Sequence, residues 1–160
     1  MIRPGTVVFI LVSGVISAAL FYVLWPNEER IVRGRLGDVA SIVSVPANET
    51  DLARMSRLAQ LREYLSPDVK IRDGAHEAVT RDMVIGTLVQ WRRSPAPVKV
   101  EFVDVQVTLD RTRPERATAY LTARVTERDT VDAREADVRL ARVDGKWVVM
   151  AAETKQTLTR

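Results

Sequence analysis

The sequence predicts an α+β protein, in which an N-terminal transmembrane helix precedes one domain of three helices on a bent antiparallel sheet. Three observations support this fold class. Residues 6–25 carry no ionisable side chain, apolar side chains then recur at intervals of three and four as far as residue 91, and from residue 98 they alternate with a period of two. We expect four parts, namely a tail (1–5), a transmembrane helix (6–25), a connector helix (26–47) and one domain (48–160), against which the helix at 28–44 packs.

The apolar segment at 6–25 has the length of a membrane span. Twenty residues at about 1.5 Å each cover roughly 30 Å, the thickness of the hydrocarbon core. Tyr22 and Trp25 lie where an interfacial aromatic belt is expected. The alternative is a cleaved signal peptide, with Arg3 before the apolar run and Ser17-Ala18-Ala19 as the cleavage site. Apolar residues continue past that site to Trp25, which favours an uncleaved anchor.

The charges beside this segment leave its orientation open. Arg3 precedes it, and Arg30, Arg33 and Arg35 follow it, so the positive-inside rule leans toward a cytoplasmic C-terminal domain. A domain longer than about 60 residues, however, crosses a membrane largely regardless of its charge.

A connector helix is predicted directly after the anchor. Asn27 can cap it, and Glu28 and Glu29 suit the positive end of a helix dipole. Gly34 and Gly37 each cost this helix about 1 kcal/mol relative to alanine, so it must be stabilised by docking on its own domain or on a partner. Its single apolar stripe supplies the candidates for partner docking, which are Val32, Leu36, Val39 and Val43.

Two more helices and a hairpin are expected before residue 98. Thr50 can cap the first of these helices, which Ser66-Pro67 stops. Asp73-Gly74 signals a tight turn between two short extended segments, and Thr80 can cap a further helix that ends near Arg93. The apolar side of the helix after Thr50 is expected to consist of Leu52, Met55, Leu58 or Ala59, and Leu65.

Four alternating runs, at 98–109, 116–126, 134–143 and 146–152, predict an antiparallel meander. Asp144-Gly145 joins the last two runs and is a strong hairpin signal. In the first run the alternation changes parity between Phe102 and Val103, which predicts a β-bulge there. The side of the later strands that faces the core is expected to comprise Ala117, Ala119, Leu121, Ala123, Val125, Ala136, Val138, Leu140, Trp147, Val149 and Ala151.

Composition excludes several functional classes. The chain has no cysteine, which excludes disulfides and thiol chemistry, and its net charge is only +3. His76 is the only histidine, so a two-histidine metal site is impossible and we expect this residue to be a partly exposed hairpin position. The basic groups at Arg92-Arg93 and around Pro114 (Arg111, Arg113 and Arg116) are interpreted as solvated turns rather than a nucleic-acid surface. We expect no metal, no cofactor and no nucleic-acid partner.

The order of these elements resembles a known superfamily. Its most specific pieces are the helix-to-strand passage Leu61-Arg62-Glu63-Tyr64-Leu65-Ser66-Pro67-Asp68-Val69 and the closing hairpin at 141–149. The chain resembles, over about residues 28–155, a membrane-anchored variant of the nuclear transport factor 2-like superfamily, which includes ketosteroid isomerases and SnoaL-type polyketide cyclases. The resemblance implies a cone-shaped, cystatin-like α+β domain, in a superfamily that contains enzymes, binders and assembly parts alike.

No residue pattern assigns a catalytic role. Similar isomerases use a carboxylate base, an oxyanion-holding tyrosine and a protonated acid in an apolar cavity. The candidates by position are Tyr64, Asp68, Asp73, His76, Trp91, Asp104 and Tyr120, and no pair has a spacing that indicates convergence. The candidates to line a ligand cavity inside the cone are Tyr64, His76, Trp91, Phe102 and Trp147, although such tryptophans more often are simply core.

We therefore expect a single-pass, membrane-anchored interaction or scaffold domain of an envelope complex, without catalysis, that contacts the bilayer and a protein partner or a second copy. Similar layouts occur in inner-membrane scaffold subunits of type IV secretion and in membrane proteins associated with mammalian-cell-entry lipid transporters. The resemblance implies a bacterial inner-membrane protein with an extracytoplasmic domain. The alternative is a binder of a lipid or small hydrophobic ligand in the cone cavity, and a SnoaL-type isomerase or cyclase is less favoured.

Overall fold

The computed structural model describes residues 27–91 and 96–155. Its elements are α2 (Glu28–Val43), α3 (Asp51–Leu61), β1 (Leu65–Asp73), β2 (His76–Ala78), α4 (Arg81–Trp91), β3 (Val98–Leu109), β4 (Arg116–Glu127), β5 (Thr130–Val143) and β6 (Lys146–Lys155). None of the helices in these two ranges has the length and apolar character that a bilayer span needs. The segment 6–25 lies outside the described residues, so the transmembrane helix stays a prediction.

The six strands form one sheet in the order β2-β1-β6-β5-β4-β3. The predicted meander is confirmed, because β3, β4, β5 and β6 pair with one another antiparallel in chain order. Asp144 and Gly145 both have positive φ (49° and 78°), as a two-residue type I′ hairpin requires. The prediction of a purely antiparallel sheet is wrong, because β1 pairs parallel with β6 and makes the sheet mixed. Local turn signals cannot reveal a pairing between strands so far apart in the chain.

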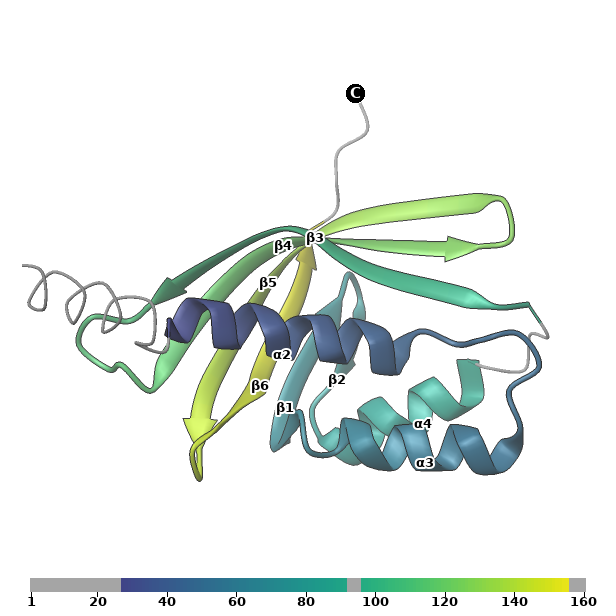
Figure 1. Ribbon diagram of the computed structural model, residues 1–160, viewed down its shortest axis with the longest axis horizontal. Coiled ribbons are helices and arrows are strands. Elements are labelled where there is room, and N and C mark those ends of the chain that lie inside the picture. Colours follow the sequence, from purple (N-terminus) through teal and green to yellow (C-terminus); the bar gives the residue numbers. More distant parts are fainter. Residues whose placement is uncertain (1–26, 92–95, 156–160) are drawn as a thin grey trace, which may run out of the picture.

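Helix α2 lies across the concave face of this sheet (Figure 1). Asn27 caps it as predicted, since its Oδ1 accepts hydrogen bonds from the N–H groups of Glu29 and Arg30 at 3.1 and 3.4 Å. Val32 and Leu36 are 0% and 1% exposed and belong to the core cluster shared with the sheet. Val39 and Val43, the other two candidates for partner docking, are half-buried against the same cluster. The domain's own sheet therefore covers the apolar stripe of α2.

Helix α3 is shorter than predicted. Thr50 caps it, but it ends at Leu61, and Leu65 is the first residue of β1 instead of the last apolar position of the helix. The N–H groups of Arg62 and Glu63 bond to carbonyls three residues earlier, so the final turn tightens. Pro67 then favours an extended conformation for the residue before it. The predicted apolar side is also wrong in part, because Leu52 and Met55 are exposed.

Two β-bulges shift which side chains face the core. In β3 the register changes between Val103 and Gln106, and Asp104 has φ +53°, which confirms a bulge within two residues of the predicted place. In β6 the register changes at Met150, because Leu140 pairs with Val149 while the preceding residue of β5 pairs with Ala151. Ala151 is buried as predicted, at 9% exposed, but it lies opposite Arg139 and outside the main core cluster. The following residue, Ala152, packs against that cluster.

Strand β3 forms one edge of the sheet, and its first residues are covered. Val45 and Val98 exchange backbone hydrogen bonds of 2.7 and 3.0 Å. The hydroxyl of Ser44 accepts from the N–H of Val100 at 2.8 Å and lies 3.1 Å from its carbonyl oxygen. The segment that follows α2 thus occupies the hydrogen-bonding groups at the start of this edge strand.

Candidate functional site

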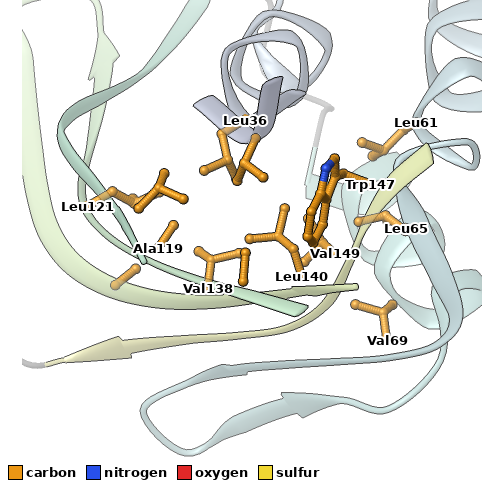
Figure 2. Packing of buried hydrophobic residues seen from close by; sticks show 14 of the residues in the cluster. Leu36, Leu61, Leu65, Val69, Ala119, Leu121, Val138, Leu140, Trp147 and Val149 are labelled. Carbon is orange, nitrogen blue, oxygen red and sulfur yellow. The ribbon is translucent and has the colours of Figure 1, made fainter. Parts of the chain in front are cut away.

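Side chains of the domain itself pack against the concave side of the sheet. Figure 2 shows the indole of Trp147 among Leu36, Leu61 and Leu65, which come from α2, α3 and β1. Trp147 is 2% exposed, and its Nε1 donates a hydrogen bond to Glu28 Oε2 at 2.9 Å. This tryptophan is therefore a core residue whose polar atom has a partner.

Two of the predicted cavity aromatics, Phe102 and Trp147, lie at different positions along the sheet. Phe102 is half-buried and lies opposite Ala123, which in turn pairs with Arg134 of β5. Trp147 lies opposite Arg142 of the same strand. The two β5 positions are eight residues apart, which is about 26 Å along a strand. Trp91 is the last residue of α4, and its side chain lies outside the described part of the structure.

Tyr64 joins α2 to β6 at the surface. The guanidinium carbon of Arg35 lies 3.7 Å from the centre of the tyrosine ring, and the hydroxyl of Tyr64 donates to Asp38 Oδ2 at 3.4 Å. Arg35 also donates from Nε to the carbonyl of Trp147 at 3.1 Å. The phenol thus bonds to a carboxylate on the outside of α2, which suits a clamp between elements better than an oxyanion-holding group.

An ion-pair cluster that no sequence pattern indicated joins β1, β5 and β6. Arg134 Nη1 lies 2.9 Å from Asp73 Oδ1, and Arg134 Nε lies 3.0 Å from Asp132 Oδ2. Thr154 donates its hydroxyl to Asp73, which lowers the pKa of that carboxyl, and the charge of Arg134 acts in the same direction. His76 is exposed and lies opposite Asp73 in the β1–β2 hairpin. Only the parallel β1–β6 pairing could have revealed this cluster.

The described carboxylates with shifted pKa values are shifted in the direction that opposes general-base catalysis. A general base in an apolar site has a raised carboxyl pKa. Asp110 instead has its pKa lowered to about 2 by hydrogen bonds from the hydroxyl and N–H of Thr112. Hydrogen bonds also lower the pKa of Asp68, Asp73 and Glu101. Among the described residues, no three acidic or histidine side chains are arranged to hold a metal ion.

Tyr120, the other phenol among the candidates, lies on the polar outer face of the sheet. A hydrogen bond with Glu135 raises its pKa. Lys155 lies 5.2 Å from the ring centre and 2.8 Å from Asp137 Oδ2. Asp104 is exposed at the bulge in β3. Tyr120 and Lys155 thus take part in hydrogen bonds and ion pairs with carboxylates of β5 on this face.

Helix α3 buries Leu58 and Leu61 in the core but leaves other apolar side chains exposed. Leu52 and Met55 are 80% and 71% exposed, and the exposed Ala59 follows at the next helical interval. Arg57 lies on the inward side, where its Nε and Nη2 donate to Glu49 at 2.7 and 2.9 Å. The Glu49 side chain is only 5% exposed. Because a surface helix normally turns its apolar side to the core, this outward apolar face, which comprises Leu52, Met55 and Ala59, marks a place where contact with another molecule would bury it.

A curved sheet with helices across its concave face defines the class of fold, that of the cone-shaped nuclear transport factor 2-like proteins. No protein-family profile and no curated protein matches the sequence.

The likeness lies in the three-dimensional structure. An NTF2-like protein of unknown function from Pseudomonas putida has a TM-score of 0.64 at 14% identity, over 82% of this chain and 88% of that one. An NTF2-like protein with a cystatin-like fold from Novosphingobium aromaticivorans has a TM-score of 0.62 at 15% identity, over 86% and 85%. The protein Aln2 from a Streptomyces species has a TM-score of 0.65 at 11% identity, over 81% and 90%. Identities this low establish the fold alone.

Proposed function

We propose that this chain is a single-pass, membrane-anchored interaction domain, a non-catalytic part of a protein complex in the bacterial envelope. The observation that carries the proposal is the outward apolar face of α3, where Leu52 and Met55 are exposed while arginines of the same helix are turned inward. Burying these two side chains against a partner would remove apolar surface from water, at about 25 cal/mol per Å². The partner would be another protein or a second copy of the chain.

The interior of the cone supports the same proposal. Val32 and Leu36 of α2 and Trp147 of β6 are buried between the helix and the sheet. The shifted carboxylates are held in the ionised form by hydrogen bonds. A domain of this kind offers its outer surface to partners more readily than its interior to a ligand.

The anchor is proposed from the sequence. Residues 6–25 are long and apolar enough to cross a bilayer as a helix, and Asn27 caps α2 two residues after Trp25. The domain would therefore be held close to the membrane surface. The proposed setting is the bacterial inner membrane, with the domain on the extracytoplasmic side.

Purification of the full-length protein in mild detergent tests the proposal, with co-purifying proteins and lipids identified by mass spectrometry. A stoichiometric protein partner that is lost from the Leu52→Glu/Met55→Glu variant is the expected result. The matched control is Val79→Glu/Val131→Glu, which places the same charges on two other exposed apolar positions and should retain the partner. Equal retention by both variants would contradict the role of α3. A monomer that carries a defined lipid or small hydrophobic molecule, and no protein, would favour the ligand-binding alternative.

A further inference from the structure

Three segments lie together at the end of the domain where the apolar segment 6–25 joins it. They are the first turn of α2, the β3–β4 loop (110–115) and the β5–β6 turn (143–146) (Figure 1). Arg142 links all three, because its N–H donates to the carbonyl of Glu115 at 2.7 Å and its Nη1 lies 2.9 Å from Glu28 Oε1. Trp25 is three residues before Glu28, and three extended residues span about 11 Å at most. This end of the domain therefore cannot lie far from the end of the apolar segment.

Basic side chains outnumber acidic ones at this end. Arg30, Arg33, Arg111, Arg113, Arg116, Arg142 and Lys146 face five acids, which are Glu28, Glu29, Asp110, Glu115 and Asp144. Internal pairing occupies two of these acids, since Glu28 binds Arg142 and Asp110 binds Arg113. Within the described ranges, Arg30, Arg33, Arg111 and Arg116 are exposed and have no acidic partner at salt-bridge distance. The free positive charge is thus concentrated on α2 and on the β3–β4 loop.

The β3–β4 loop is held in one conformation by Asp110. Its Oδ1 accepts from the N–H of Thr112 at 2.9 Å and from the N–H of Arg113 at 3.2 Å, and it also accepts from the Thr112 hydroxyl at 2.7 Å. The N–H of Asp110 closes the loop by donating to the carbonyl of Arg116 at 2.9 Å. An ordered loop loses less conformational entropy on binding, so its arginines are suited to contact a charged surface.

We propose that this end of the domain, with Arg111 and Arg116 as its principal contacts, rests on the anionic phospholipid headgroups around the anchor. The inference depends on the proposed membrane anchor and adds the identity of the surface that the domain contacts. Basic residues close to an anionic bilayer each contribute about 1 kcal/mol of attraction, which decays over one Debye length. Glu29, Glu115 and Asp144 oppose the attraction, which makes docking sensitive to the lipid charge and to salt.

The absence of cysteine in the chain allows one probe position to be chosen at will. Val143→Cys places a fluorophore on the exposed β5–β6 turn, and Asp129→Cys places it in the β4–β5 turn, at the other end of the twelve-residue strand β4. The full-length protein is reconstituted into vesicles of phosphatidylcholine alone or with about 30 mol % phosphatidylglycerol, both containing headgroup-quencher lipid. We expect the Val143 probe to be quenched strongly in anionic vesicles only, and the Asp129 probe to be quenched weakly in both.

Charge reversal then identifies the contact residues. Arg111→Glu/Arg116→Glu should lower the ratio of docked to undocked domain by about tenfold or more, whereas the control Arg124→Glu/Arg128→Glu, toward the other end of β4, should leave it unchanged. Equal quenching of the Val143 probe in both vesicle types overturns the inference, as does an unaltered ratio after charge reversal at 111 and 116. After either of these negative results, resistance of the protein to alkaline carbonate extraction would still support the proposed membrane anchor. Release of the protein by carbonate would contradict both the proposed membrane anchor and the proposed docking on lipid headgroups.

Discussion

The two glycines in the middle of α2 provide a sharp test of the structure. Gly34 and Gly37 are exposed interior residues of a sixteen-residue helix, and a Cβ added at either position would meet no atom within 4 Å. Nothing in the described fold therefore requires glycine at these positions. We expect Gly34→Ala and Gly37→Ala to stabilise the domain, because alanine restricts the unfolded chain and favours the helical state.

The expected gain is about 1 kcal/mol in the free energy of unfolding for each substitution. It is about 2 kcal/mol for the double variant, because neither added methyl group meets a neighbouring atom through which the two could interact. For a domain of this size 1 kcal/mol raises Tm by roughly 4 °C, so the double variant should melt about 8 °C higher. Thermal unfolding of the full-length protein in detergent, followed by tryptophan fluorescence, measures the shift, because Trp147 is buried in the core.

Two further glycine-to-alanine substitutions serve as controls for this Tm measurement. Gly86→Ala in α4 also meets open space and should raise Tm. Gly145→Ala should lower it, because Gly145 has φ +78° in the β5–β6 turn. An unchanged or lower Tm for Gly34→Ala/Gly37→Ala, with both controls behaving as expected, would refute the reasoning. It would mean that the outer side of α2 is covered in the intact protein.

Three further outcomes are expected. Leu36→Ala should cost about 2–5 kcal/mol because the side chain is 1% exposed in the core, and a loss below 1 kcal/mol in urea unfolding would contradict the placement of α2. Arg57→Ala should cost about 3 kcal/mol by breaking the buried pair with Glu49, and Glu49→Ala/Arg57→Ala should recover part of it. The pKa of Asp110, about 2, lies below the ordinary 3.8, so its stabilisation is complete above about pH 4 and is lost as pH falls through 2. In the Asp110→Asn variant, the urea concentration at half-unfolding should therefore fall less between about pH 4 and pH 2 than in the wild-type protein. An equal fall in both proteins would contradict this prediction.

The elements that the sequence predicted well are those specified by neighbouring residues. Asn27, Thr50 and Thr80 cap their helices because each has an oxygen that can accept a hydrogen bond from a backbone N–H close along the chain. The Asp144-Gly145 turn and the alternation in β4 and β5 follow in the same way from local chemistry. A helix cap, a two-residue turn and a pleated strand are each complete within a few residues, so local sequence is enough to specify them.

The features that the sequence did not reveal depend on contacts between distant residues. The parallel β1–β6 pair brings Asp73 to Thr154, and no local pattern indicates it. The extra residue at Met150 places Ala152 instead of Ala151 opposite Val138, although the apolar alternation continues through Ala151. In α3 Leu52 and Met55 are exposed while Leu58 and Leu61 are buried, and Arg57 is held on the inward side by its pair with Glu49. Apolar periodicity alone therefore assigned the buried side of this helix correctly only in part.

The covered start of β3 affects how neighbouring copies of the protein can meet. An open strand edge is a template on which another chain can add a strand, and the risk grows with local concentration. Here Ser44 and Val45 occupy the backbone groups of the first part of this edge, and the bulge at Asp104 interrupts its regular spacing. The opposite edge, β2, is only three residues long. Neighbouring copies at high local concentration can therefore contact one another through side chains without pairing their edge strands into a continuous sheet.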